Sequence, residues 1–88
     1  VSQNYPNPFN PTTTIEVRLP AQADMKVKIV DILGREVRTL SYEKLPAGVH
    51  RVVWDGTNSR GTTVASGVYL YQVRVGDNTI TRRMLLLR

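Results

Sequence analysis

The sequence has no cysteine, a single histidine and few aromatic residues. Without cysteine no disulfide can staple the chain, so a hydrophobic core must hold its 88 residues together. A domain of this length hides only about 60–65% of the surface that its unfolded chain exposes. No run approaches the roughly 20 apolar residues of a membrane-spanning helix. The length therefore predicts one small domain with a thin margin of stability.

Catalysis needs a nucleophile, a base or a metal gathered in a cleft, and the sequence offers little for any of these. The one histidine, His50, lies in the middle of a predicted strand, with no serine or aspartate at a suggestive spacing. Glu16, Glu36 and Glu43 form no local acidic pair of the kind that drives sugar hydrolysis. We expect a protein that is not an enzyme and that carries no cofactor.

The polar loop from Asp55 to Gly61 contains side-chain oxygens that suit calcium. Calcium sites normally use several carboxylates, whereas this loop has a single aspartate. Asp55 and Asn58 are expected instead to accept hydrogen bonds from their own backbone and so close the turn. No metal site is predicted.

The formal charge is +5, from 12 basic and 7 acidic residues. A nucleic-acid interface would gather basic residues on one helix or loop. Here they are spread singly along predicted strands, at Arg18, Lys26, Lys28, Arg38, Arg51 and Arg74. This spacing is typical of solvated sheet faces, and we expect no nucleic-acid partner.

The first eleven residues, VSQNYPNPFNP, contain three prolines and three asparagines. Proline fixes its own backbone and pushes its predecessor toward extended geometry. The segment is therefore predicted to be an extended lead-in over residues 1–11. Tyr5 and Phe9 are expected to anchor it on the flank of the domain.

From Thr12 onward, apolar and polar residues alternate with a period of two, as in half-buried strands. Turn-forming residues separate the runs, and no segment keeps a helical period. The pattern predicts strands over residues 13–19, 25–31, 36–40, 49–54, 68–75 and 79–88. About seven short antiparallel strands indicate an all-β sandwich over residues 12–88. Trp54 is the natural centre of its core.

Tyr69 and Tyr71 are in register on one strand and are able to stack on a sugar, while Tyr42 is isolated. A carbohydrate-binding module would need such rings exposed in a planar row. Because their strand is expected to be central, these tyrosines are predicted to lie in the core.

The C-terminal residues Ile80 to Arg88 begin in alternation and end in four consecutive apolar residues before the final arginine. A strand that is apolar on both faces either closes the core between two layers or offers an edge to a partner. The residues by themselves leave these two readings open.

Several motifs in order resemble a known family. They are Asn4 to Ile15, Val30 to Val37, Leu45 to Gly48, Trp54 to Gly56, Gly67 to Tyr71 and Arg82 to Arg88. Together they cover nearly the whole chain and resemble the type A C-terminal sorting domains of the type IX secretion system of Bacteroidota. The block from Trp54 to Tyr69 is similar also to the immunoglobulin-like domain of the flagellar hook-capping protein. The proline-asparagine opening and the terminal strand favour the sorting domain.

The resemblance implies an immunoglobulin-like sandwich in which the family motif has a structural role. Its residues here are Tyr5, Pro6, Pro8, Phe9, Asp31, Gly34, Gly48, Trp54, Asp55, Gly56, Gly67 and Tyr69. It further implies a signal that directs an upstream cargo domain of the same polypeptide through the outer-membrane translocon. A shuttle protein and a sortase-like surface protease are the implied partners. The implied location is the periplasm in transit, then the cell surface or the medium.

In the family the last strand carries much of the recognition, which here implies Arg82, Arg83, Met84, Leu85, Leu86, Leu87 and Arg88. Many members have lysine where this chain has arginine, which keeps the charge but changes the hydrogen-bond geometry. If the strand closes the core, the translocon must read its outward face and its tip. Arg83 and Arg88 are then better candidates than the leucines. A structural or assembly module of the hook-capping kind, or a spacer, is the alternative reading.

Overall fold

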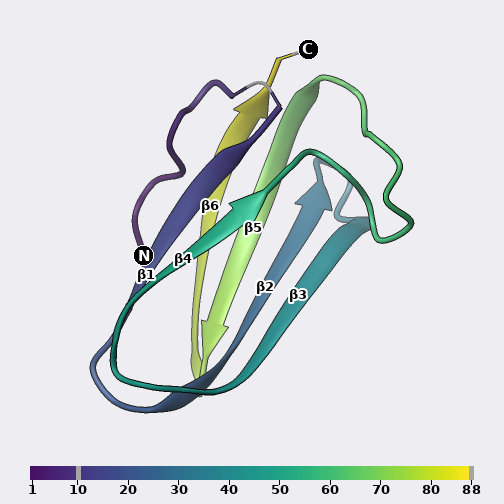
Figure 1. Cartoon of the computed structure of the whole chain (residues 1–88). Coiled ribbons are helices and arrows are strands. Elements are labelled where there is room, and N and C mark those ends of the chain that lie inside the picture. Colours follow the sequence, from purple (N-terminus) through teal and green to yellow (C-terminus); the bar gives the residue numbers. More distant parts are fainter. Residues whose placement is uncertain (10, 88) are drawn as a thin grey trace.

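The computed structural model describes residues 1–9 and 11–87, and its regular structure there is entirely β. The strands are β1 (Thr13–Leu19), β2 (Ala23–Asp31), β3 (Glu36–Leu45), β4 (Gly48–Trp54), β5 (Gly67–Val75) and β6 (Asn78–Leu86). They form a two-stranded sheet, β1-β4, packed on a four-stranded sheet of order β3-β2-β5-β6, with all pairs antiparallel (Figure 1). The predicted all-β, immunoglobulin-like sandwich is confirmed. In the described part of the chain no helix is long and apolar enough to cross a membrane.

Six strands occur in the described residues, where about seven were expected. The lead-in makes isolated bridges and no continuous strand. Tyr5 bridges Thr14 of β1, and Phe9 bridges Leu86 of β6. The segment bends between these two bridges, at residues 6–8, and is therefore not extended throughout.

The core forms where the inner faces of the two sheets meet. Along β1, Ile15, Val17 and Leu19 are buried, and the side chains between them face outward. Val73 and its in-phase neighbours on β5 face them from the other sheet. The period-two pattern therefore predicted these faces correctly.

Trp54 lies at the centre of this core, as predicted, and is only 1% exposed. Its ring lies 5.6 Å from the ring of Phe9 and 5.4 Å from that of Tyr69. The indole Nε1 donates to the backbone oxygen of Thr57 at 2.8 Å. The one polar atom of this large side chain is thus satisfied at the edge of the core.

Two predicted strand ends are wrong, and β2 begins at Ala23, two residues before its predicted start. β3 continues to Leu45 and does not end at Leu40, because its polar second half pairs with β2 as far as Ala23. β6 ends at Leu86, so Leu87 lies beyond the strand. The predicted strand end at Arg88 falls outside the described residues.

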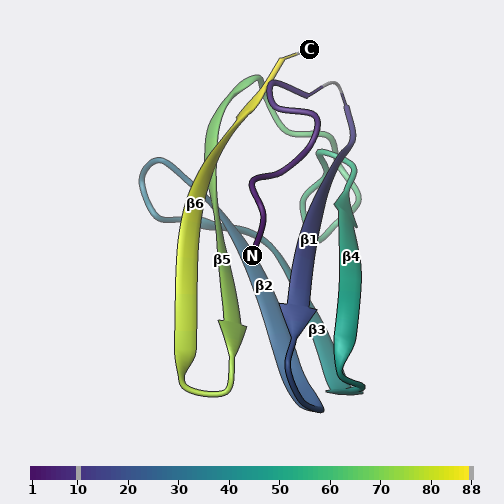
Figure 2. The same cartoon turned by 90° about the vertical axis from the view of Figure 1, so that its left-hand side faces the viewer.

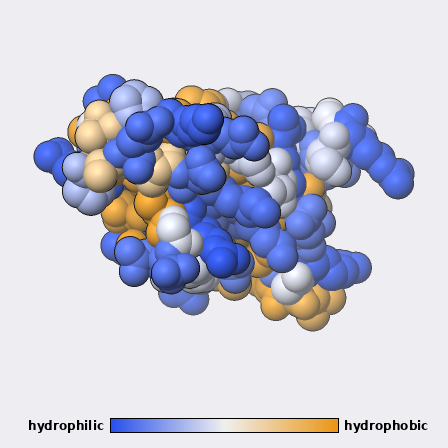
Figure 3. Space-filling model, turned by 90° about the horizontal axis from the view of Figure 1, so that it is seen from below, coloured by the Kyte–Doolittle hydropathy of each residue, from blue (hydrophilic) through white to orange (hydrophobic). Residues whose placement is uncertain are grey.

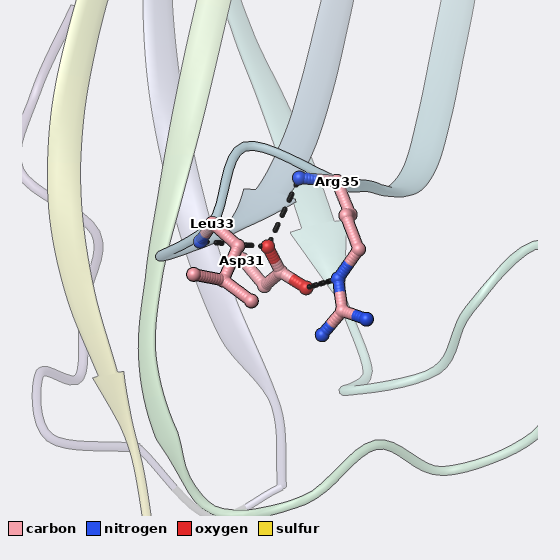
Figure 4. A network of polar contacts seen from close by, with 3 residues as sticks. All are labelled: Asp31, Leu33 and Arg35. Carbon is pink, nitrogen blue, oxygen red and sulfur yellow. Dashed lines mark hydrogen bonds and ion pairs between the residues drawn. The ribbon is translucent and has the colours of Figure 1, made fainter.

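The β2–β3 connection is closed by the Asp31 carboxylate (Figure 4). Its Oδ1 accepts from the backbone N–H groups of Leu33 and Arg35, and its Oδ2 accepts from Arg35 Nε at 2.8 Å. Desolvation acts to raise the pKa of Asp31, but these hydrogen bonds and the Arg35 charge outweigh it and hold the pKa below 3.8. Gly34 supplies a φ of +81°, which side chains disfavour. The predicted tight connection is confirmed.

The loop after β4 closes on its own side chains, as predicted. Asp55 Oδ1 accepts from the backbone N–H and the hydroxyl of Thr57. Asn58 Oδ1 accepts from the N–H groups of Arg60 at 2.9 Å and Thr62 at 3.1 Å. The Thr57 hydroxyl is the main reason that the pKa of Asp55 is lowered. These oxygens are engaged in turn closure, as expected of Asx turns.

Seen from below, the surface is mostly hydrophilic, with hydrophobic residues in separate patches (Figure 3). Scattered apolar residues of this kind are normal on a soluble surface and do not by themselves mark an interface.

Candidate functional site

The terminal strand β6 forms one edge of the four-stranded sheet, with β5 as its neighbour. Its last residues alternate between the two faces. Met84 is 1% exposed and Leu86 is 0% exposed, and both lie in the core. Leu85 is half-buried and Leu87 is 48% exposed. The strand therefore closes the core with one face and presents the other face outward.

The predicted recognition residues do not form one surface. Arg82 and Arg83 are both exposed, but as adjacent strand residues they point to opposite faces. Arg82 pairs with Tyr71 in the strand register, so its side chain lies on the core-facing side of the sheet. It nevertheless remains exposed at this position. Arg83 shares the outward phase with Leu85. Arg88 lies outside the described residues.

The lead-in covers the outer edge of β6 near its end. Phe9 N–H donates to the Leu85 carbonyl, and Leu87 N–H donates to the Phe9 carbonyl, each at 3.0 Å. Asn7 Oδ1 accepts from the Leu85 N–H at 3.0 Å, and Gln3 Nε2 donates to the Arg83 carbonyl at 2.8 Å. Backbone groups that an edge strand would offer to a partner are thus occupied at residues 83–87.

The same lead-in also pairs with the other sheet. Ser2 N–H donates to the Glu16 carbonyl at 2.8 Å, and Tyr5 and Thr14 exchange two backbone hydrogen bonds at 2.9 Å. Figure 2 shows the lead-in running between β1 on one side and β6 on the other. It therefore bridges the open side of the sandwich.

A buried polar cluster holds the lead-in in place. Asn4 and Thr13 are 2% and 1% exposed, and Asn4 Nδ2 donates to Thr13 Oγ1 at 3.0 Å. Thr13 Oγ1 donates in turn to the Pro6 carbonyl at 2.8 Å. The Tyr71 hydroxyl accepts from Asn4 N–H at 2.9 Å and donates to the Ser2 carbonyl at 3.0 Å. The sequence analysis missed this cluster, because an asparagine among prolines looks like an ordinary turn residue.

Burial raises the pKa of Tyr71 above 10.0, while the Asn4 N–H and the Arg82 charge act in the opposite direction. The phenol is therefore held in its protonated form, which it needs to donate to the lead-in.

The prediction that Tyr5 and Phe9 both anchor the lead-in is half wrong. Phe9 is 2% exposed and packs on Trp54, whereas Tyr5 is 80% exposed. Tyr5 holds the lead-in through its backbone bonds to Thr14, which leaves its ring in solvent.

The other residues of the family motif occupy structural positions. Trp54 and Tyr69 are in the core, and Asp31 and Asp55 close turns. Pro6 and Pro8 each follow a cis peptide bond. The remaining motif residues are glycines with positive φ, at Gly34, Gly48, Gly56 and Gly67.

The residues first considered for other chemistry have structural surroundings. His50 Nε2 lies 2.7 Å from the Pro46 carbonyl, on the narrow sheet. Tyr69 and Tyr71 are buried, so they form no exposed row for a sugar. Across residues 1–9 and 11–87, no cluster of three or more acidic or histidine side chains is positioned to hold a metal ion.

Two known proteins resemble the sequence closely over part of its length. The basal-body rod modification protein FlgD of Salmonella typhimurium is 48% identical over 59 residues, which are 66% of this chain and 25% of that protein. FlgD of Escherichia coli is 42% identical over 59 residues, 26% of its length. The chain thus spans about a quarter of these curated relatives.

Solved structures show the same fold. Latent, dimeric PorU from Porphyromonas gingivalis superposes with a TM-score of 0.77 at 24% identity, over 97% of this chain and 9% of its own. PorZ, a surface component of the type IX secretion system of that organism, gives 0.65 at 28% identity, over 98% and 11%. FlgD from P. aeruginosa gives 0.67 at 23% identity, over 85% and 60%.

The family assignment rests on a wider match than those of the two FlgD relatives, each of which covers 66% of this chain. The model of the FlgD Ig-like domain matches residues 3–79, from the lead-in to the start of β6. Because this match takes in most of the chain, the chain belongs to the FlgD Ig-like domain family.

Proposed function

We propose that this chain is a non-catalytic sorting domain that directs an upstream cargo protein through a type IX translocon. In this proposal the domain passes through the periplasm and reaches the cell surface with its cargo. Its partners are the outer-membrane translocon, a shuttle protein and a sortase-like surface protease. Residues 12–88 carry the sandwich, and residues 1–11 are the lead-in that completes it.

The observation that carries the proposal is the extent of each likeness. The FlgD Ig-like domain match ends at residue 79, before most of β6, and the FlgD structure from P. aeruginosa covers 85% of the chain. PorZ, the surface component of the type IX system, covers 98% of the chain and is 28% identical. The likeness to a type IX component thus extends over the part of the chain that the FlgD match leaves out.

The geometry of β6 divides the proposed signal into two parts. Met84 and Leu86 belong to the core, so their contribution is structural. Arg83, Leu85 and Leu87 share the outward phase, and we assign the contact with the translocon or shuttle to this face. An arginine beside apolar side chains suits a partner surface that is apolar with an acidic rim.

Deleting Met84–Arg88 would remove two core side chains and so confuse unfolding with loss of a signal. A sharper test changes the outward face alone, with Arg83→Glu combined with Leu85→Ser and Leu87→Ser. A fluorescent reporter is fused ahead of residue 1 and expressed in a type IX-competent host. We expect surface display to be lost while the purified variant keeps its cooperative thermal unfolding.

The matched control is Arg18→Glu, which makes the same charge change on β1 in the other sheet. It should leave surface display intact. Display that survives the triple change would refute the role of this face. Display that survives removal of the whole domain would refute the sorting role itself.

An assembly module of the hook-capping kind is the second candidate, favoured by the 48% identity to FlgD of Salmonella typhimurium. It predicts self-association or partner binding that does not depend on the outward face of β6. Light scattering of the wild-type domain and the triple variant separates the two candidates. Concentration-dependent association of both proteins to the same extent would support the assembly module.

A further inference from the structure

The outer face of the four-stranded sheet carries a hollow of about 300 Å³ that none of the roles above uses. It lies on the face away from β1 and β4, since its β2 side chains alternate with the buried Met25, Val27 and Ile29. Its lining is polar, with three cations and one carboxylate, and consists of Lys26, Lys28, Glu36, Thr39, Gln72, Arg74 and Thr79.

The strand register brings the cations of this hollow together. Lys26 on β2 is the direct partner of Arg74 on β5, and like charges in such a pair are destabilising. Lys28 lies two residues further along the same face. Its direct neighbours across the sheet are Thr39 on β3 and Gln72 on β5, both capable of donating a hydrogen bond.

These cations are not neutralised by the described residues. The ion pairs there are Arg35 with Asp31 and Arg51 with Glu16, and both lie outside the hollow. Arg74 Nε donates to the Gly76 carbonyl at 3.4 Å, which leaves the rest of its guanidinium available. Glu36 is the one carboxylate among the lining residues, against three cations.

Two more carboxylates lie in an adjoining hollow that shares Lys26 and Arg74. Asp24 accepts from the Lys44 N–H at 2.8 Å, so it is engaged at the β3 end. Glu43 lines the same hollow without an ion pair among the described residues. The Lys26–Arg74 pair therefore lies between the two hollows, with Lys28 on one side and this acidic end on the other.

Thr39 provides an independent observation. Its Oγ1 is buried and has no hydrogen-bond partner in the described structure. A buried hydroxyl without a partner is uncommon, because leaving it unsatisfied costs about 1–3 kcal/mol. Thr39 lies opposite Lys28 and lines the hollow, so rotation about its χ1 would turn the hydroxyl toward an anion held by the cations.

We propose that this hollow binds a phosphate monoester group. The Arg74 guanidinium and the ammonium groups of Lys26 and Lys28 neutralise the dianion, and the Thr39 hydroxyl donates to one of its oxygens. Charge-assisted bonds to several donors are the strong kind, and guanidinium matches the geometry of phosphate oxygens. The three cations and one carboxylate of the lining carry a net positive charge, which a doubly charged anion would balance. This inference does not depend on the proposed sorting function.

The test uses the wild-type chain with ¹⁵N labelling at low ionic strength, because salt screens exposed charges. Glucose 1-phosphate and inorganic phosphate are titrated separately, with glucose as the neutral control. We expect both phosphates, and not glucose, to shift the amide resonances of Lys28, Thr39 and Arg74 along saturable curves. Shifts no larger there than at Arg18 on the other sheet would overturn the proposal.

Two variants test the assigned donors. Arg74→Gln should weaken glucose 1-phosphate binding about tenfold or more, the loss expected for one charge-assisted bond. Arg18→Gln, with the same charge change on β1, should leave the affinity unchanged within about twofold. An equal loss of affinity in both variants would mean that net charge, and no built site, attracts the anion, and would refute the proposal.

Thr39→Val removes the hydroxyl and keeps the shape. If the hydroxyl serves a ligand, this variant should bind glucose 1-phosphate about tenfold more weakly, while its melting temperature without ligand stays equal or rises. Unchanged affinity would refute the role given to Thr39.

The phosphate group could be presented by a soluble ester or by a lipid, and a second measurement separates these sources. The domain is sedimented with phosphatidylcholine vesicles that contain phosphatidic acid. Binding to soluble phosphates without co-sedimentation is the expected result. Co-sedimentation without binding of either soluble phosphate would overturn the proposal in favour of a membrane-facing surface.

Discussion

The backbone N–H of Asn4 donates to the hydroxyl of Tyr71 at 2.9 Å, across 67 positions of sequence. The same hydroxyl donates to the Ser2 carbonyl, so one phenol satisfies two backbone groups of the lead-in. The lead-in is thereby fixed against β5, one of the two inner strands of the four-stranded sheet, and it covers the end of β6 at the same time. Its conformation and the accessibility of the terminal strand are therefore linked.

Tyr71→Phe should destabilise the fold and loosen the lead-in. The change leaves the Asn4 N–H and the Ser2 carbonyl without their partner, at a cost of about 1–3 kcal/mol in the free energy of unfolding. Urea unfolding followed by Trp54 fluorescence measures this cost. Hydrogen exchange at the Phe9 and Leu87 amides should also become faster. Tyr5→Phe is the control, since its ring is 80% exposed, and should change neither quantity.

Trp54→Ala should cost about 3–5 kcal/mol, because it removes a fully buried side chain that contacts Phe9 and Tyr69. In a domain of this size such a loss should leave little cooperative unfolding at room temperature. A thermal melt followed by circular dichroism tests this. Val53→Ala, next in the strand but exposed, should stay within about 0.5 kcal/mol of wild type. Equal melting of the two variants would contradict the position of the core.

Substitutions of Leu86 and Leu87 should differ in how much they lower the free energy of unfolding. Leu86→Ala empties a fully buried site and should cost about 2–5 kcal/mol, whereas Leu87→Ala changes an exposed residue beyond the strand and should cost little. Chemical denaturation of both variants measures the difference. Comparable losses would mean that the ending packs as a whole and that its outward face is not available to a partner.

The acid sensitivity of the domain should depend on Asp31. Its folded pKa is lowered from 3.8, so its contribution to stability is complete above that value and is lost as the pH falls through the folded pKa. Asp31→Asn keeps an oxygen for the turn but no longer titrates. Below pH 3.8 its free energy of unfolding should therefore fall less steeply than that of wild type.

Asp55 acts with the same sign, since its pKa is also lowered. In the double variant Asp31→Asn with Asp55→Asn, the free energy of unfolding should therefore fall even less steeply as the pH is lowered. Denaturation by urea at a series of acidic pH values measures these slopes. Identical slopes in wild type and the double variant would contradict the assignment of acid sensitivity to the two turn carboxylates.

The period-two pattern predicted the sandwich because it reports, residue by residue, which side of a strand meets the core. It placed Trp54 and Tyr71 correctly for that reason. It failed on β3, an edge strand whose second half, from Ser41 to Leu45, places only Tyr42 and Leu45 against the core. The end of that strand is set by its pairing with β2, and no local pattern of side chains records it.

The candidate site was predictable only in part. Alternation showed that the terminal strand could have a buried face, but it did not show that the lead-in covers its edge. That contact joins Phe9 to Leu85 and Leu87 through backbone atoms, which leave no signature in the sequence. The cationic hollow was missed for a similar reason, because Lys26 and Arg74 look isolated along the chain and become neighbours only through strand pairing.

The lead-in also bears on the order in which the domain is built. Its bonds to β6 join the first residues of the chain to the last, so they are contacts of the greatest sequence separation and slow to form. During synthesis, β1 to β5 can be complete while the sheet edge is still missing and the lead-in lacks its partners on β6. Folding therefore cannot finish until Leu87 has been added, and any machinery that meets the chain earlier encounters an unfinished sheet.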